Sequence, residues 1–197
     1  MEIPIFPLNG AVLFPGTSLP LNIFEKRYIE MVDYALSKER CIGMIQTDQK
    51  NKLYNIGCIG KIHSFSETAD GRYLISLQGT NCFKVRKELE KKHKFRLIEA
   101  EMLDFEEDKN FVNEKQKNKL LEKYSQYIKV KNINLNLEEI QNIDFNQIIK
   151  FIAMISPFSD IEKQVLLETK SLSDFYKKLQ SILELEIVED GINKTIN

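Results

Sequence analysis

The sequence predicts an α+β protein in which a β-rich first half is joined to an all-helical second half. Short apolar runs separated by turn dipeptides fill about the first hundred residues. After residue 105 the pattern changes to long stretches with apolar residues at steps of three and four. The acidic run Glu106-Glu107-Asp108 marks the change. We therefore expect a β lobe over residues 1–105 and a four-helix bundle lobe over residues 106–197.

The first half contains strand-like runs, one helix and one hairpin. Ile3–Leu8 holds two prolines, which lack a backbone donor, and this indicates an edge strand or a strand end. Helical spacing predicts a helix over residues 25–37. Asp70-Gly71, between two alternating runs, predicts a hairpin of strands 59–65 and 73–78. Further strands are expected over residues 19–23, 40–46, 83–87 and 95–105.

The second half contains four helical segments, which we expect over residues 111–129, 137–155, 159–168 and 171–186. The second ends in the run 148–155, which is apolar nearly all round and indicates the most buried helix. Ser159 and Glu162 have the spacing of a capping box, which predicts where the third helix begins. The polar segment Val188–Asn197 is expected to fray.

Composition excludes several classes of protein. The 197 residues carry 28 basic and 29 acidic side chains, so no large basic surface for nucleic acid is expected. Cys41, Cys58 and Cys82 lie in apolar strand-like runs, which predicts reduced, buried thiols and a cytoplasmic location. The N-terminus lacks the features of a signal peptide, and no run has the ~18 apolar residues of a membrane span.

No catalytic, cofactor-binding or metal-binding motif is present. The sequence contains no phosphate-binding GxxxxGK[ST] loop, no dinucleotide-binding GxGxxG and no GxSxG nucleophile turn. His63 and His93 are 30 residues apart, and His63 has only Cys58 nearby where a zinc site needs further ligands. We therefore expect no enzyme, no cofactor and no metal.

The most informative segment is the first thirty residues. It reads Ile3-Pro4-Ile5-Phe6-Pro7-Leu8, then Val12-Leu13-Phe14-Pro15-Gly16, then Leu19-Pro20-Leu21-Asn22-Ile23-Phe24-Glu25 and Arg27-Tyr28. This segment closely resembles the opening of the N-terminal substrate-binding domain of ATP-dependent Lon proteases. The form PLxIFExRY is similar to that of free-standing single-domain relatives.

The resemblance extends over most of the chain. Residues 54–62, the Asp70-Gly71 hairpin and residues 74–85 are similar to family strands, although Asn81-Cys82 stands where the family has basic residues. Lys163–Leu179 is similar to a helical stretch of the family. The resemblance implies a PUA-like β-barrel followed by a helical bundle. In Lon this region holds substrate proteins, and separate ATPase and Ser–Lys peptidase domains perform catalysis.

Two functions are compatible with these features. The first is a non-catalytic protein- or peptide-binding module, an adaptor or regulator in protein quality control whose partners are unfolded proteins or peptides and a protease. Its expected binding residues are Phe14, Phe24, Tyr28 and Phe65. The alternative is an RNA-binding PUA-like module that uses the basic stretch Lys84, Arg86, Lys87, Lys91, Lys92, Lys94 and Arg96, with His93 and Phe95. No membrane partner is expected.

Overall fold

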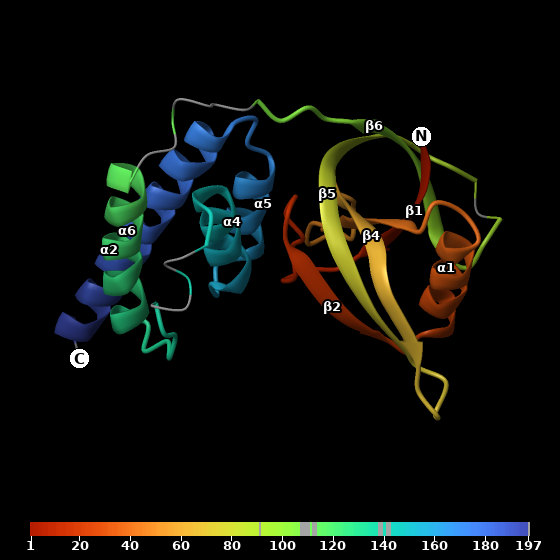
Figure 1. The fold of residues 1–197 in the computed structure, drawn as a ribbon, viewed down its shortest axis with the longest axis horizontal. Helices are drawn as coiled ribbons and strands as arrows, with labels where there is room; N and C mark the ends of the chain where they lie inside the picture. Colours follow the sequence, from red (N-terminus) through yellow and green to blue (C-terminus); the bar gives the residue numbers. More distant parts are fainter. Residues whose placement is uncertain (91, 107–110, 112–113, 138–139, 141–142, 197) are drawn as a thin grey trace. The chain divides into compact units, whose positions relative to one another are not determined.

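The computed structural model describes residues 1–90, 92–106, 111, 114–137, 140 and 143–196 (Figure 1). The chain divides into two compact units. The first contains Met1–Phe105 and Ser156–Glu168, and the second contains Glu106–Ile155 and Thr169–Asn197. The α+β class predicted from the sequence is confirmed. Residues 107–108 of the acidic junction lie outside the described residues.

The first unit is a β-barrel closed by pairing of its last strand with two others. Five strands form the ring in the order β1–β3–β4–β5–β6, and β6 pairs with both β1 and β5. The β1–β3 pair is parallel and the other ring pairs are antiparallel. The sixth strand, β2, pairs with β5 outside the ring. The bounds are β1 Glu2–Pro7, β2 Ser18–Ile23, β3 Cys41–Ile45, β4 Ile56–Glu67, β5 Tyr73–Glu88 and β6 Arg96–Met102.

Apolar side chains from several strands fill the barrel. A tight cluster joins residues of β1, β3, β4, β5 and β6, all at most 4% exposed. Helix α1, Lys26–Leu36, turns Tyr28, Met31, Val32 and Ala35 toward the protein interior, so the helix predicted over 25–37 is confirmed. The cluster consists of Ile3, Ile5, Ile45, Ile59, Phe83, Ile98 and Ala100.

Strand β1 has neighbours on both sides, so the predicted edge strand is wrong, whereas the alternative of a strand end holds for Pro7. Pro4 lies where β1 pairs only with β6, since the parallel register with β3 begins at Ile5. Pro7 ends the strand, and the next donor is supplied by Leu8, whose N–H donates to the Ile45 carbonyl at 2.9 Å. The prolines therefore occupy positions where the missing N–H does not interrupt the ladder.

Strand β5 runs without a break where the sequence predicts two strands. Residues 73–78 pair with β2 and with the outer part of β4, whereas residues 83–88 pair with β6. A register shift in the β4–β5 ladder separates Gly79 from Cys82. At Gly79, an added Cβ would lie 2.2 Å from the carbonyl oxygen of Phe14. Gly79 thus allows the backbone of the loop between β1 and β2, which contains Phe14, to lie directly against β5.

Helix α5, Asp160–Leu167, belongs to the barrel unit, so the predicted four-helix bundle lacks this member. The capping box of Ser159 and Glu162 is confirmed. Gln46, which is 1% exposed, donates to the Asp160 carbonyl at 3.0 Å and to Gln164 Oε1 at 3.1 Å. Lys163 Nζ donates to the Gly10 carbonyl at 3.0 Å. Buried polar groups, which hydropathy patterns do not reveal, attach this helix to the barrel.

The second unit contains helices α2 (Glu114–Val130), α4 (Phe145–Ile155) and α6 (Leu172–Ile196). Phe111, Phe145 and Tyr176 form an aromatic cluster with ring centroids 5.3–6.4 Å apart. Lys123 and Glu184 form an ion pair between α2 and α6 at 3.0 Å. Helix α6 continues through the segment that the sequence predicts to fray. Residues 112–113, 138–139 and 141–142 of the predicted helices lie outside the described residues.

We predict that Gly79→Ala destabilises the protein by about 3 kcal/mol, because the new methyl group overlaps the Phe14 backbone rather than a flexible side chain. Gly71→Ala is the comparison, since Gly71 has φ +79° and nothing near the added Cβ. Its cost should be about 1 kcal/mol, from the left-handed backbone alone. Urea unfolding of both variants measures the difference, and equal losses would contradict the steric explanation.

Lys163 predicts a dependence of stability on pH. Burial lowers the pKa of its ammonium group from the ordinary value of 10.5, and the nearby Asp160 carboxylate opposes this. As the pH rises from that lowered pKa toward 10.5, the unfolded chain holds more protons than the folded one, so the free energy of unfolding rises. Lys163→Met should lack this contribution. Urea unfolding from about pH 8 to pH 10 should show the free energy of unfolding rising more for the wild type than for the variant. The same pH dependence in both proteins would contradict this prediction.

Candidate functional site

The structure places the four binding residues expected from the sequence in two different environments. Phe14 is 1% exposed and its backbone is bonded to the Thr17 hydroxyl, so it has no surface to offer a ligand. Tyr28 is buried on the inward side of α1, with its ring 4.3 Å from that of Phe6. Phe24 and Phe65 are exposed, by 66% and 43%. Of the four expected residues, Phe24 and Phe65 are therefore the ones that present aromatic surface to solvent.

Phe65 and Phe24 lie at one end of the three-stranded region β2–β5–β4. Phe65 packs edge-on against Tyr73, with ring centroids 4.9 Å apart. Phe24 directly follows Ile23, which is in register with Tyr73. We call Phe24, Phe65 and Tyr73 the aromatic arm. Leu74, 43% exposed, adds apolar surface on the neighbouring position of β5.

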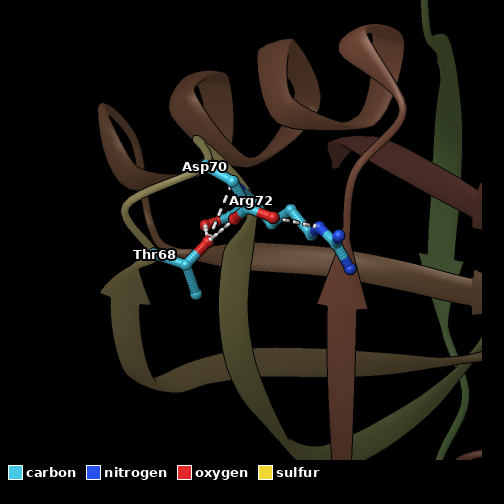
Figure 2. A network of polar contacts seen from close by, with 3 residues as sticks. All are labelled: Thr68, Asp70 and Arg72. Atoms are coloured by element: carbon cyan, nitrogen blue, oxygen red, sulfur yellow. Dashed lines mark hydrogen bonds and ion pairs between the residues drawn. The ribbon is translucent and has the colours of Figure 1, made fainter.

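The hairpin beyond the aromatic arm is closed by a polar network (Figure 2). The Thr68 hydroxyl donates to the Asp70 carboxylate and accepts from the Arg72 N–H at 3.1 Å. Arg72 Nε forms an ion pair with Asp70 Oδ2 at 2.8 Å. Gly71 takes φ +79° and its N–H donates to the Thr68 carbonyl, so the predicted Asp70-Gly71 hairpin is confirmed.

The pKa shifts of Asp70 and Tyr73 follow from this network and from a second contact, between Tyr73 and α1. The Thr68 hydrogen bond, then the Arg72 charge, lowers the pKa of Asp70. On the helix side, the Tyr73 hydroxyl donates to Asp33 Oδ1 of α1 at 3.1 Å. Burial first and this hydrogen bond second raise the pKa of Tyr73. The β4–β5 hairpin is thus held at its turn by the Thr68 network and at Tyr73 by the bond to Asp33. This order lowers the conformational entropy that the hairpin would lose on binding a ligand.

The basic stretch proposed for RNA is interleaved with carboxylates. Arg96 makes a two-point pair with Glu88 at 2.7 and 2.8 Å, and Arg86 pairs with Glu101. Lys94 Nζ lies 3.6 Å from Glu30. Lys91 lies outside the described residues. Arg86, Lys94 and Arg96 each have a carboxylate partner, which partly neutralises their charge and disfavours an extended surface for nucleic acid.

Metal-ligating side chains do not converge in the part of the chain that the structure describes. No three His, Cys, Asp or Glu side chains among these residues are placed to hold a metal ion. Cys58 is buried and Cys41 and Cys82 are half-buried, and each is a thiol rather than part of a disulfide. Burial raises the pKa of the Cys41 thiol, which disfavours the reactive thiolate. In the described residues, no helix has the length and apolar character to cross a membrane.

Sequence reasoning missed Tyr73 and Arg27 as surface-forming residues. Tyr73 sits first in β5, directly after the hairpin, where a strand face leaves the core and becomes accessible. Its position one residue past the Asp70-Gly71-Arg72 turn could have indicated this. Arg27 lies over the Tyr28 ring at 4.5 Å, a contact that depends on helix geometry and packing and has no separate sequence signal.

Comparison with known proteins agrees with the fold. The Lon protease of Buchnera aphidicola subsp. Baizongia pistaciae is 25% identical over 95% of this chain. The Lon protease of Cytophaga hutchinsonii is 30% identical over 45% of it. The chain spans about a quarter of the length of the first of these relatives.

Two solved structures share the fold. A Lon N-terminal domain protein from Xanthomonas campestris has a TM-score of 0.63 and 17% identity, covering 93% of this chain and 98% of the other. The N-terminal domain of Mycobacterium avium complex Lon protease has a TM-score of 0.61 and 15% identity, covering 95% and 98%. The family model of the ATP-dependent protease La (Lon) substrate-binding domain matches residues 2–185. The chain belongs to the Lon substrate-binding domain family.

Proposed function

We propose that this chain is a non-catalytic module that binds unfolded proteins or peptides through the aromatic arm. The observation that carries the proposal is the exposure of Phe65 on the β4–β5 hairpin, which hydrogen bonds hold at its turn and at Tyr73, and of Phe24 at the end of the neighbouring β2. The family's name states substrate binding, and the matched region covers nearly the whole chain. Phe14 and Tyr28 then serve the fold beneath this surface.

The chemistry of the arm favours a polypeptide without stable structure. Large aromatic side chains gain about 1.5–3 kcal/mol each when they are fully buried against apolar groups. Such contacts require apolar side chains but no particular sequence, and unfolded segments expose these side chains. Tyr73 adds a ring next to Phe65, so a ligand would meet two adjoining aromatic surfaces.

We further propose that the module acts as an adaptor or regulator in protein quality control, with a protease as its partner. The relatives that the chain resembles are Lon proteases, and the part of them that it matches is their substrate-binding domain. Peptide-bond cleavage would therefore be performed by a protease that acts with this chain or is joined to it. The free cysteines support the cytoplasm as the compartment.

We predict that Phe24→Ser with Phe65→Ser weakens binding to a reduced, carboxymethylated protein by about tenfold or more, since roughly 1.4 kcal/mol of lost apolar burial equals a factor of ten. Ile161→Ser with Met102→Ser is the control. Ile161 and Met102 are 64% and 43% exposed, which matches Phe24 and Phe65. Fluorescence anisotropy of the labelled ligand measures the dissociation constants.

Circular dichroism should give unchanged folds for both double variants, because all four side chains are exposed. The control variant should bind as the wild type does. Equal weakening by the two double variants would mean that general surface hydrophobicity, rather than the aromatic arm, drives the association. Undetectable binding of the wild-type chain would remove the proposed function altogether.

A further inference from the structure

A pocket of about 360 Å³ lies on the barrel unit beside the start of α1. Its wall comes from the end of β1, the loop before β4, the first turn of α1 and the residues that enter β6. The lining residues are Pro7, Arg27, Tyr28, Thr47, Asn51, Lys94, Phe95 and Arg96.

The charged residues of this wall have one sign. Arg27, Lys94 and Arg96 line the pocket, and none of the described lining residues carries a carboxylate. Each cation has a carboxylate partner beyond the lining, namely Glu25, Glu30 and Glu88 respectively. These partners hold the cations in place and leave the pocket itself lined by donors.

The two guanidinium groups retain donors for a second acceptor. Arg27 uses Nε and Nη2 toward Glu25, and Arg96 uses the same two atoms toward Glu88. Among the described residues, no partner is found for the Nη1 group of either arginine. Since a guanidinium carries five N–H donors, each arginine can bind its present partner and a further oxygen.

Two buried aromatic residues support the wall from beneath. Tyr28 and Phe95 are 8% and 3% exposed. Tyr28 packs on Phe6 at 4.3 Å and carries Arg27 over its ring at 4.5 Å, and Phe95 stacks on His93 at 4.8 Å. With Thr47 and Asn51, the cations give the pocket a mainly polar lining that suits an anionic group.

The loop opposite is fixed by side-chain hydrogen bonds. The Asp48 carboxylate accepts from the N–H groups of Lys50 and Lys52 at 2.8 and 2.9 Å. The Asn9 side chain accepts from the Thr47 N–H at 2.8 Å. Asn51 is therefore presented from a tight turn, with φ +58°. A preformed wall reduces the ordering cost of binding.

We infer that this pocket, which we call the basic pocket, binds a carboxylate of the same unfolded polypeptide that the aromatic arm holds. The inference rests on the proposed function. The carboxylate can be the C-terminal one or an Asp or Glu side chain. It would accept from the guanidinium groups of Arg27 and Arg96.

The experiment compares three fluorescein-labelled, apolar-rich peptides of identical core sequence. One ends in a free carboxylate, the second ends in an amide, and the third ends in an amide with Glu as its penultimate residue. Anisotropy with the full chain should give about tenfold tighter binding of the first than of the second, the strength of one charge-assisted contact. Tight binding of the third identifies an acidic side chain as a sufficient source, and weak binding identifies the C-terminus.

Arg27→Gln with Arg96→Gln should abolish the preference for the carboxylate. Arg86→Gln is the control, because Arg86 and Arg27 are both 53% exposed and both paired with one glutamate, yet Arg86 lies outside the pocket. The control should keep the preference. Circular dichroism checks the fold, and the wild-type comparison of acid with amide tests the inference without any variant.

Three outcomes overturn the inference and leave the proposed function standing. Equal binding of all three peptides by the wild type shows that no carboxylate is recognised, and a preference that survives in the double variant places recognition elsewhere. Binding of a labelled polyuridine that the double variant loses, without any effect on the peptides, would assign the basic pocket to phosphates instead. If no peptide binds at all, the proposed function fails and the inference with it.

Discussion

Closure of the barrel depends on the length of β5. One half of this strand, residues 83–88, pairs with β6 and completes the ring, while the other half, residues 73–78, pairs with β2. Between them, Gly79 accepts from the Gly16 N–H at 2.9 Å and donates to the Thr17 carbonyl at 2.8 Å. The missing side chain is what allows this contact, because any Cβ would overlap Phe14. Strand β5 can therefore pair with β2 along its first part and with β6 along its last part without interruption.

The exposed aromatic residues are a consequence of this geometry. Because β4 and β5 both continue beyond the ring, their hairpin lies where no further strand covers Phe65. An uncovered hairpin alone is marginally stable in water. Here β2 adds a third strand, Tyr73 is tied to Asp33, and the Thr68–Asp70–Arg72 network closes the tip. The apolar surface is thus presented by ordered backbone.

Local sequence signals predicted the elements whose causes are themselves local. The Asp70-Gly71 turn, the helix near Tyr28 and the Ser159 capping box each depend on residues within a few positions. Burial of Gln46 and Gln164 was not predictable in this way, because polar residues become core residues only when distant segments satisfy their hydrogen bonds. For this reason the sequence predicts α5 as part of the helical half, whereas the structure places it in the barrel unit.

The same reasoning explains why two of the expected binding residues are buried and two are exposed. Phe14, Phe24, Tyr28 and Phe65 are alike in chemistry, and composition cannot say which of them face water. Strand alternation places Ile23 inward, and the next position is Phe24 at 66% exposure. Phe14 is buried because its loop lies on β5 at Gly79, a contact between residues 65 positions apart. Side-chain exposure here is decided by long-range packing.

Helix α1 connects the aromatic arm with the basic pocket. Phe24 immediately precedes the N-cap Glu25, whose carboxylate holds Arg27 at the pocket wall, and Asp33 near the other end holds Tyr73. Phe24 of the arm and Arg27 of the pocket are three positions apart, on either side of the N-cap Glu25. Three residues of chain span at most about 11 Å, a distance that an extended peptide covers in about three or four residues. A single short peptide segment with an apolar residue and a carboxylate at that spacing would engage both surfaces, which makes the second contact intramolecular and strengthens the first.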